Sequence, residues 1–415
     1  MYKWKLGRLA DVAQIFSGFA FKTSDLGENG VPVIKIGNIQ KKLVIEKCKD
    51  HIDPSLITPR MKRYFLNAED TLVAMTGAGS VGRVGKMHSV KSSFLVNQRV
   101  AIVRPDLNIC DPSYIYYALS ENSVEERLYG LGLGAGQPNI SAAQIGGVEI
   151  PLPSMAFQKK ISQILSNYDA LIDNNSRRII VLESIALSFY REFFVNYQIP
   201  SRADLSFVDS EAGRIPVGWT VLDVKSIAGL ISRGPSLSYV ESDGVPVVNQ
   251  KCIRNGEIEM QAIQYAAPLS SRKSHLYLEM YDVLINSMGV GTLGRVSRNL
   301  SIQDLTIIHN CITVVRAKPG EPYSAFLYYR LSEQQRHFES LGIGATGQTS
   351  LRIETIEDLK VAVPPLEILS KFEEIVIPIW QEIGLLKRMN SNLLETKDLL
   401  RPRLLSGQVE LMVGE

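Results

Sequence analysis

The segment DTLVAMTGAGSVGRV at residues 70–84 returns as DVLINSMGVGTLGRV at residues 282–296. Seven of the fifteen positions are identical, whereas ordinary residue frequencies give about one identity by chance. The same spacing of 212 residues carries AIVRP at 101–105 onto TVVRA at 313–317, and YYALSE at 116–121 onto YYRLSE at 328–333. The chain therefore consists of two copies of one module, each of about 210 residues.

The composition is that of an ordinary globular protein. Of 415 residues, 45% are hydrophobic and 21% are charged, which excludes a disordered or fibrous chain. The formal net charge of +2 argues neither for nor against a nucleic-acid partner, so any basic surface must be local. The N-terminus has no apolar stretch typical of a signal peptide, and no apolar run is long enough to span a membrane. We therefore expect a cytoplasmic protein that does not enter the membrane.

Each copy is predicted to begin with a sheet-rich domain of the α/β (α+β) fold class. Before Pro151 and Pro364, short β-branched runs alternate with glycine, asparagine, aspartate and proline, and brief helical stretches lie between them. After these prolines the apolar period changes to seven residues, which predicts one long coiled-coil helix per copy. A strict heptad period favours pairing of the two helices over packing of each helix on its own domain alone.

The heptads define a seam on each predicted helix. One asparagine in each seam is typical of a polar position that fixes register. Pro378 predicts a kink or a later start in the second helix. The seam residues are Ile161, Leu165, Ile172, Asn175, Ile179, Leu182 and Phe189 in the first helix, and Phe372, Val376, Ile383, Leu386, Asn390, Leu393 and Leu400 in the second.

The glycine-rich segments match G-x-G-x-x-G, but a dinucleotide site needs that loop to end a strand and open a helix. The residues that follow, RVGKMHSV and RVSRNLSI, are typical of extended chain, so we predict loops that connect two strands. No methyltransferase Asn-Pro-Pro-Tyr, helicase or G-x-S-x-G motif is present. The four cysteines and five histidines lack metal-ligand spacing, so we expect no metal site and no cofactor on this chain. The sequence favours binding over catalysis.

Clusters of basic residues in turn-like segments are suited to DNA phosphates, and nearby amides are suited to base edges. Arg295 lies beside Arg298 in one such cluster. The first-copy candidates for DNA binding are Lys35, Asn38, Lys41, Lys42, Arg60, Lys62, Arg63, Ser80, Arg83, Lys86, Gln98, Arg99, Gln137 and Asn139. The second-copy candidates are Asn249, Gln250, Lys251, Arg254, Arg272, Lys273, Thr292, Arg295, Asn310, Gln348 and Thr349.

Over essentially its whole length the sequence resembles the DNA-specificity subunits of type I restriction-modification systems. The resemblance rests on the order and duplication of several motifs. They are WKLGRLADV with IPVGWTVLDV, the paired segments ending in GRV, LGAGQPNIS with LGIGATGQTS, IPLP with VPPL, SFYREFFVNY, and LLRPRLLSGQVE. One departure is VPPLEILSKF, which lacks the glutamine that the first copy has at Gln158. This departure puts a local contact at the start of the second helix in doubt.

The resemblance implies two target-recognition domains related by a pseudo-two-fold axis and separated by two antiparallel helices. The implied boundaries are residues 1–153 and 198–363 for the domains, 154–197 for the first helix, and 364–415 for the second helix and tail. Each domain would read one half of a bipartite site in double-stranded DNA. An approximate dyad perpendicular to the duplex independently favours antiparallel helices.

The resemblance also implies a non-catalytic subunit that works with partners. Two modification subunits carrying S-adenosylmethionine would methylate adenine, and restriction subunits would use ATP and magnesium. The helices and the flanking Phe189, Phe193 and Phe194 would form the docking surface. The alternative is a coiled-coil scaffold that organises partners without reading DNA. A methyltransferase acting alone is disfavoured by the missing motifs.

Overall fold

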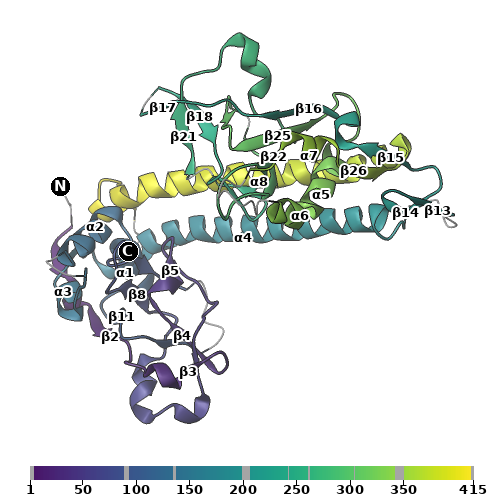
Figure 1. The fold of residues 1–415 in the computed structure, drawn as a ribbon. Helices are drawn as coiled ribbons and strands as arrows, with labels where there is room; N and C mark the ends of the chain where they lie inside the picture. The colour runs from purple at the N-terminus through teal and green to yellow at the C-terminus, as the bar shows by residue number, and fades with distance from the viewer. Residues whose placement is uncertain are drawn as a thin grey trace. The chain divides into compact units, whose positions relative to one another are not determined.

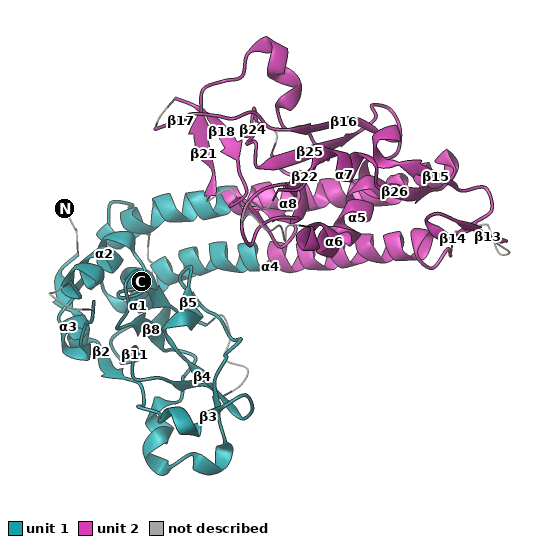
Figure 2. Ribbon diagram, in the orientation of Figure 1, with its two compact units in different colours: residues 1–173, 392–415 teal, residues 174–391 magenta. Residues whose placement is uncertain are grey.

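The structure is a computed structural model that describes residues 4–87, 93–133, 137–198, 206–241, 243–259, 262–302, 304–341 and 350–412 (Figure 1). Unit 1 contains residues 1–173 and 392–415, and unit 2 contains residues 174–391 (Figure 2). The boundary between the units falls inside both long helices, α4 (Met155–Phe194) and α8 (Leu366–Ser406). The linear domain boundaries expected from the sequence stay a prediction, because each compact unit takes part of both helices.

Besides the helix segments, unit 1 contains short strands and helices in the following order. They are β1 (Leu6–Arg8), η1 (Leu9–Asp11), β2 (Ala13–Ser17), η2 (Thr23–Asp25), β3 (Leu26–Gly27), β4 (Val31–Ile34), η3 (Ile36–Asn38), β5 (Ile39–Gln40), β6 (Leu43–Val44), β7 (His51–Ile52), η4 (Pro54–Leu56), η5 (Pro59–Tyr64), β8 (Thr71–Ala74), β9 (Val84–Gly85), β10 (Leu95–Val96), β11 (Val100–Pro105), α1 (Pro112–Leu119), α2 (Asn122–Leu131), α3 (Ala142–Gly146) and β12 (Glu149–Pro151).

Unit 2 repeats the order of the strands and α-helices after one additional hairpin. Its elements are β13 (Phe207–Ser210), β14 (Gly213–Pro216), β15 (Thr220–Asp223), η6 (Val224–Ser226), β16 (Ala228–Arg233), β17 (Tyr239–Val240), β18 (Val245–Val248), β19 (Ile253–Arg254), β20 (Glu257–Ile258), β21 (Gln264–Ala266), η8 (Ser271–Leu276), β22 (Val283–Asn286), β23 (Val296–Arg298), β24 (Ile307–Ile308), β25 (Ile312–Ala317), α5 (Ser324–Glu333), α6 (Gln335–Ser340), α7 (Ile353–Glu357) and β26 (Lys360–Val363).

The two units have the same sheet topology. The larger sheets have the orders β2-β11-β8-β9 and β10-β4-β7-β3 in unit 1, and β16-β25-β22-β23 and β24-β18-β21-β17 in unit 2. The two-stranded pairs β1-β12 and β5-β6 correspond to β15-β26 and β19-β20. The prediction of two related sheet-rich domains is therefore confirmed, and β13-β14 is an addition to the second copy.

The glycine-rich segments connect antiparallel strands, as predicted. Strand β8 pairs with β9, and β22 pairs with β23, across the two G-x-G-x-x-G loops. Gly82 and Gly294 have φ of 82° and 79°, a backbone conformation that residues with a side chain rarely adopt. A Cβ at Gly82 would also collide with the backbone of Tyr129 on α2, and a Cβ at Gly294 with that of Glu339 on α6. These glycines are required by the turn and by close packing.

A buried aspartate–arginine pair is repeated in both copies. The guanidinium of Arg104 donates to both carboxylate oxygens of Asp70 at 2.9 and 2.7 Å, and Arg316 does the same to Asp282 at 2.7 and 2.8 Å. Both aspartate side chains are fully buried. The arginines also donate to the carbonyl oxygens of Phe65 and Tyr277 at 3.0 and 2.8 Å. These bonds join β11 to the residue that follows η5, and β25 to the residue that follows η8. The aspartate and arginine that recur in the sequence repeat thus stabilise the interior of each domain.

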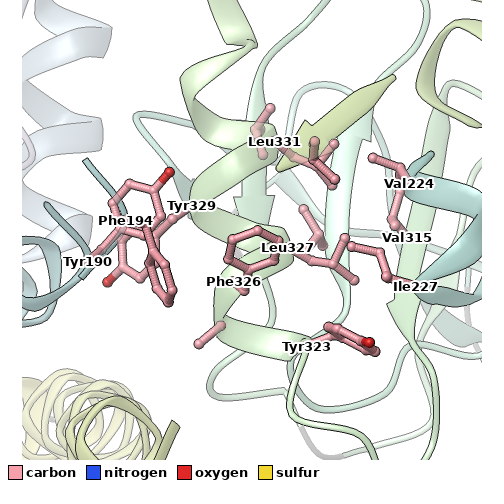
Figure 3. Packing of buried hydrophobic residues seen from close by; sticks show 14 of the residues in the cluster. Tyr190, Phe194, Val224, Ile227, Val315, Tyr323, Phe326, Leu327, Tyr329 and Leu331 are labelled. Carbon is pink, nitrogen blue, oxygen red and sulfur yellow. The ribbon is translucent and has the colours of Figure 1, made fainter. Parts of the chain in front are cut away.

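The core of unit 2 is rich in aromatic residues, and Figure 3 labels Tyr190 and Phe194 of α4 together with Phe326 and Tyr329 of α5. Helix α8 adds Phe372 and Trp380. The ring of Phe194 lies 5.2 Å from Phe326 and 4.7 Å from Phe372, and Tyr190 stacks on Tyr329 at 4.7 Å. Phe193 and Phe194 are 2% and 1% exposed. The expectation that Phe193 and Phe194 form a docking surface is wrong, because burying each ring here is worth about 1.5–3 kcal/mol.

The core of unit 1 is built in the same way from smaller side chains. Ile161 and Leu165 of α4 pack with Leu404 and Leu405 of α8 and with Tyr114 of α1. The start of one long helix and the end of the other therefore complete this core. The phenol of Tyr114 also donates to the carbonyl oxygen of Pro151 at 2.8 Å, which fixes α1 next to the start of α4.

The two long helices run antiparallel in each unit. In unit 2, Asn175 donates to Asn390 at 2.9 Å and Arg178 pairs with Glu382 at 2.6 Å. In unit 1, Lys397 pairs with Asp169 at 2.6 Å. All the predicted seam residues are buried or half-buried. Helix pairing is confirmed, and the two seam asparagines bond to each other.

Pro378 lies inside α8, which begins at Leu366 and continues to Ser406. The later helix start that this proline predicts is therefore wrong. A proline in a helix interior costs about 3 kcal/mol. The neighbouring Val376 and Trp380 are fully buried, and burial of two such side chains offsets this cost.

The start of each long helix is joined to its domain by a different contact. In the first copy Gln158 accepts from the backbone of Asp111 at 2.9 Å, and Asp111 caps α1 through the backbone N–H of Tyr114. At the corresponding place in the second copy Leu369 is fully buried. Glu373 of α8 instead accepts from the backbone N–H of Ala325 at 2.9 Å and caps α5. Burial raises the pKa of Glu373. The contact that Gln158 makes in the first copy is thus absent at Leu369, and Glu373 caps the neighbouring helix instead.

We expect the Asn175–Asn390 pair to behave as a unit in stability measurements. Replacing Asn390 alone with leucine removes the bond to Asn175, which is 5% exposed, and should cost about 1–3 kcal/mol of unfolding free energy. The double variant N175L/N390L should recover that loss, since leucine is favoured in a helix seam. Urea denaturation of the four proteins of this cycle measures the coupling. Additive losses would show that the two amides do not depend on each other.

Candidate nucleic-acid interface

Main-chain hydrogen bonds gather five loops of unit 1 at one end of its two larger sheets. The backbone N–H of Met75 donates to Arg99 at 2.9 Å, that of Gly77 to Pro138 at 3.2 Å, and that of Asn97 to Ile34 at 2.9 Å. Gln98 donates to Phe19 at 2.9 Å. We call residues 18–20, 34–38, 75–82, 97–99 and 137–140 the first loop edge.

The corresponding loops of unit 2 are gathered by equivalent bonds. His309 donates to Val248 at 2.9 Å, Ser287 to Cys311 at 2.8 Å, and Leu351 to Ser287 at 2.9 Å, all through their backbone N–H groups. Residues 234–236, 248–251, 287–292, 309–311 and 350–351 form the second loop edge. Loops on a rigid sheet scaffold are where proteins commonly place binding residues.

Glycine begins the first loop of each edge for a steric reason. A side chain at Gly18 would collide with the carbonyl oxygens of Val96 and Asn97, and one at Gly234 would collide with those of Ile308 and His309. Only glycine lets the two loops approach so closely. These two glycines end the matching sequences IFSG and ISRG, so the sequence repeat marks the loop edge itself.

Apart from Asn38 and Asn249, ten of the candidate residues lie on the loop edges. Exposed or half-buried polar groups there include a guanidinium, amides and hydroxyls, which are the groups that read base edges and hold phosphates. They are Lys35, Ser80, Gln98, Arg99, Gln137 and Asn139 on the first loop edge, and Gln250, Lys251, Thr292 and Asn310 on the second. Gln348 and Thr349 lie outside the described residues.

A short basic helix accompanies each loop edge. Residues Arg60, Lys62 and Arg63 are exposed on η5, whose Met61 is buried, and Arg63 lies 4.7 Å above the ring of Phe16. In unit 2, Arg272 and Lys273 are exposed on η8, whose Leu276 is buried. Each helix is thus held by one apolar residue and presents cations to solvent, as phosphate contacts require.

The hairpin β5-β6 carries a strained basic turn. Lys41 and Lys42 have φ of 50° and 66°, whereas the equivalent turn of β19-β20 has Asn255 and Gly256, which adopt such angles readily. Lys41 is exposed, but the ammonium of Lys42 donates to Asn122 at 2.7 Å, and burial lowers its pKa. Of the two lysines, Lys41 is the one free to meet a phosphate.

Two candidate asparagines are used inside the protein. Asn38 accepts from the backbone of Lys35 at 3.0 Å and donates to the carbonyl of Ile45 at 2.9 Å. Asn249 is 2% exposed, accepts from the backbone of Lys251 at 2.9 Å and donates to Gln264 at 3.0 Å. Reading adenine would need both ends of the amide. Both amides are therefore bonded inside the protein, and base reading by Asn38 and Asn249 stays a prediction.

Several candidate cations are also engaged. Arg295 donates to the carbonyls of Ile253 and Gly291 at 3.2 and 2.8 Å, so its fork holds a hairpin rather than a phosphate. Lys86 is half-buried next to Ser113 at 3.2 Å, and burial lowers its pKa. The expectation of a phosphate contact at Arg298 is wrong, because its side chain is only 3% exposed. The exposed Arg83 and Arg254 stay predictions.

One feature beside the second loop edge, the contact of Tyr239 on β17 with His309, has no signal in the sequence. The ring of Tyr239 is 43% exposed and stacks on His309 at 5.8 Å. A lone histidine and a distant tyrosine have no diagnostic spacing, so only the fold brings them together. A stacked aromatic pair among exposed loops is suited to apolar contact with a base.

The described residues contain no cluster of three or more histidine, cysteine, aspartate or glutamate side chains that could hold a metal ion. None of the described helices combines the length and apolarity needed to cross a bilayer. All four cysteines are free thiols.

Known proteins match both copies of the module. A family model described as "Type I restriction modification DNA specificity domain" matches residues 1–184 and 216–388. The chain is 25% identical over 335 residues to the type I restriction enzyme MjaIX specificity subunit of Methanocaldococcus jannaschii, covering 79% of this chain and 76% of that protein. It is 22% identical over 375 residues to the HindI specificity subunit of Haemophilus influenzae, covering 76% and 82%.

A solved structure shares the fold over nearly the whole chain. The crystal structure of a type I restriction-modification S subunit from M. genitalium superposes with a TM-score of 0.62 at 16% sequence identity, covering 99% of this chain and 97% of that one. At this identity the match shows that the two chains share their fold.

We expect the η5 cations to contribute to DNA affinity through phosphates. The variant R60Q/K62Q/R63Q should bind duplex DNA more weakly, with the slope of log affinity against log salt reduced by about 0.9 for each phosphate that the variant leaves without a cation. The control R127Q removes an exposed arginine of α2 in the same unit and should leave the slope unchanged. Fluorescence anisotropy across a salt series measures both. An unaltered slope in the triple variant would exclude η5 from the interface.

Proposed function

Because this chain belongs to the DNA specificity family of type I restriction-modification systems, we propose that its two domains each read one half of a bipartite DNA site. The chain is a DNA sequence-specificity subunit. The observation that carries the proposal is the duplication of the loop edge, in which equivalent hydrogen bonds position different side chains. A duplicated reader on one duplex recognises two half-sites.

The two half-sites should differ in sequence. The turn Asn97-Gln98-Arg99 of the first loop edge corresponds to His309-Asn310-Cys311 of the second. The guanidinium of Arg99 is therefore replaced by the thiol of Cys311. Arginine typically binds guanine through two hydrogen bonds, whereas asparagine typically binds adenine. The loop edges therefore offer different chemistry to the major groove while the sheets below them stay the same.

The chain supplies recognition, and partner subunits supply the chemistry. Modification subunits, two of them for two domains, would carry S-adenosylmethionine and methylate adenine, and restriction subunits would use ATP and magnesium. Exposed apolar side chains of the helices are suited to dock such partners. In unit 2 they include Ile180, Val181, Ile185, Leu385 and Met389, which are 41–69% exposed.

The scaffold alternative also uses the helices, but it gives the loop edges no role. It predicts a complex that forms on the helices and binds DNA without sequence preference. The family match to both domains favours sequence reading.

Exchange of one domain should change one half-site only. Replacing residues 1–150 with those of another family member transfers the whole first loop edge and leaves the second intact. Methylation sequencing of DNA from cells that express the hybrid with its partner subunits should show one new and one unchanged half-site. The reciprocal exchange of 206–363 serves as the control. Alteration of both halves by either exchange would contradict modular reading.

A four-residue deletion from both helices should shorten the spacer between half-sites by about one to two base pairs. Four residues span about 6 Å and turn about 40° beyond a full turn, whereas one base pair advances about 3.4 Å and turns about 34°. Residues 170–173 and 392–395 face each other near the unit boundary, as the Asp169–Lys397 and Asn175–Asn390 pairs show on either side. The same methylation sequencing measures the spacer, and an unchanged spacer would disprove that the helices set it.

A further inference from the structure

Arg298 joins the second recognition domain to both long helices. It ends strand β23, and its guanidinium lies 3.9 Å from the ring of Tyr328 on α5 and 4.4 Å from that of Trp380 on α8. One terminal nitrogen donates to both carboxylate oxygens of Glu183 on α4, at 2.8 and 2.6 Å. A single buried side chain thus contacts three elements besides its own.

Two further contacts hold the same domain against the same helices. A side chain at Gly384 of α8 would collide with the carbonyl oxygen of Leu300, two residues after Arg298, so the backbones meet there. Lys387, one turn further along α8, pairs with Glu257 of β20. Arg298 is therefore at the centre of a joint that permits little sliding or rotation of the domain on its helices.

The energetics of a buried ion pair favour a role in orientation. Removing the charge of Arg298 from water costs several kcal/mol, so its pair with Glu183, which is 29% exposed, adds little net stability compared with apolar packing. Its value lies in geometry, since a guanidinium sandwiched between two rings and paired with a carboxylate tolerates one arrangement well. The Nε–H of Arg298 has no hydrogen-bond acceptor among the described residues, so the rings replace that contact.

The first unit is joined differently at the equivalent positions. Lys86, 212 residues before Arg298, bonds to Ser113 of its own domain at 3.2 Å. Asp169 occupies the place of Trp380 in the repeat and accepts from the phenol of Tyr117 at 2.6 Å and from Lys397 at 2.6 Å. That joint is made of hydrogen bonds at a half-buried carboxylate, so the arginine sandwich is specific to unit 2.

We propose that Arg298 is a positioning residue through which the specificity subunit discriminates spacer length, an inference that rests on the proposed bipartite reading. Each added base pair moves the second half-site by about 3.4 Å along the duplex and by about 34° around it. A domain fixed on its helices meets the half-site at one spacing. A domain that rocks on its helices also meets half-sites that are displaced by one base pair.

The test uses the complete complex with its modification subunits and duplexes that carry both half-sites at the natural spacer and at one base pair more or fewer. The readout is the ratio of initial methylation rates at the natural spacer to those at the altered spacers. For R298M we expect this ratio to fall at least about tenfold, while the dependence on the bases of each half-site is retained. R298K should be intermediate, because an ammonium pairs with Glu183 but does not stack as a plane.

Two further variants complete the experiment. E183Q keeps the guanidinium of Arg298 between the two rings and removes only the charge of Glu183, whose side chain is 29% exposed. We expect this variant to fold even if R298M does not. It should lower the ratio less than R298M does. K225M removes the exposed Lys225–Asp358 pair, which lies within the domain, and should leave the ratio at the wild-type value. Equal loss of methylation at every spacer in R298K and E183Q, or an unchanged ratio in both, would overturn the inference. If the wild-type complex ignored half-site sequence, the proposed function itself would fail.

Discussion

Each long helix completes the hydrophobic core of both units, and this constraint governs the rest of the molecule. Helix α4 contributes Ile161 and Leu165 to the core of unit 1 and Phe193 and Phe194 to that of unit 2. Helix α8 contributes Phe372, near its start, to the core of unit 2 and Leu404, near its end, to that of unit 1. At about 1.5–3 kcal/mol per buried side chain, these contacts are a large part of the stability of a domain. Neither domain can close its core without both helices.

The duplicated scaffold shows which parts of a recognition domain are free to change. The pairs Asp70–Arg104 and Asp282–Arg316 are the same in both copies, since an unpaired charge in either position would be buried at high cost. The cap of the next helix differs between the copies: Asp111 caps α1, whereas Glu373 of α8 caps α5. A hydrogen bond can be supplied from another element, whereas an arginine paired with a fully buried carboxylate must change together with it.

The sequence predicted the architecture well because repeats and periodicity report burial. The 212-residue spacing identified the duplication, and the heptads identified seam residues that are buried or half-buried. Periodicity does not report the partner of a side chain, which is why Phe193 and Phe194 were expected on the surface. Nor does residue type distinguish an amide that reads DNA from one that holds a loop, as Asn249 does, or a phosphate-binding arginine from Arg298. Those assignments depend on contacts between residues that are distant in sequence.

We infer that the chain carries two different readers of DNA, one in each unit. Single-molecule sequencing of methylated DNA, from cells that express this chain with its modification subunits, tests it most directly. We predict one methylated motif made of two unlike half-sites that flank a non-specific spacer of constant length. A continuous motif, two identical half-sites, or half-sites at variable separation would contradict it.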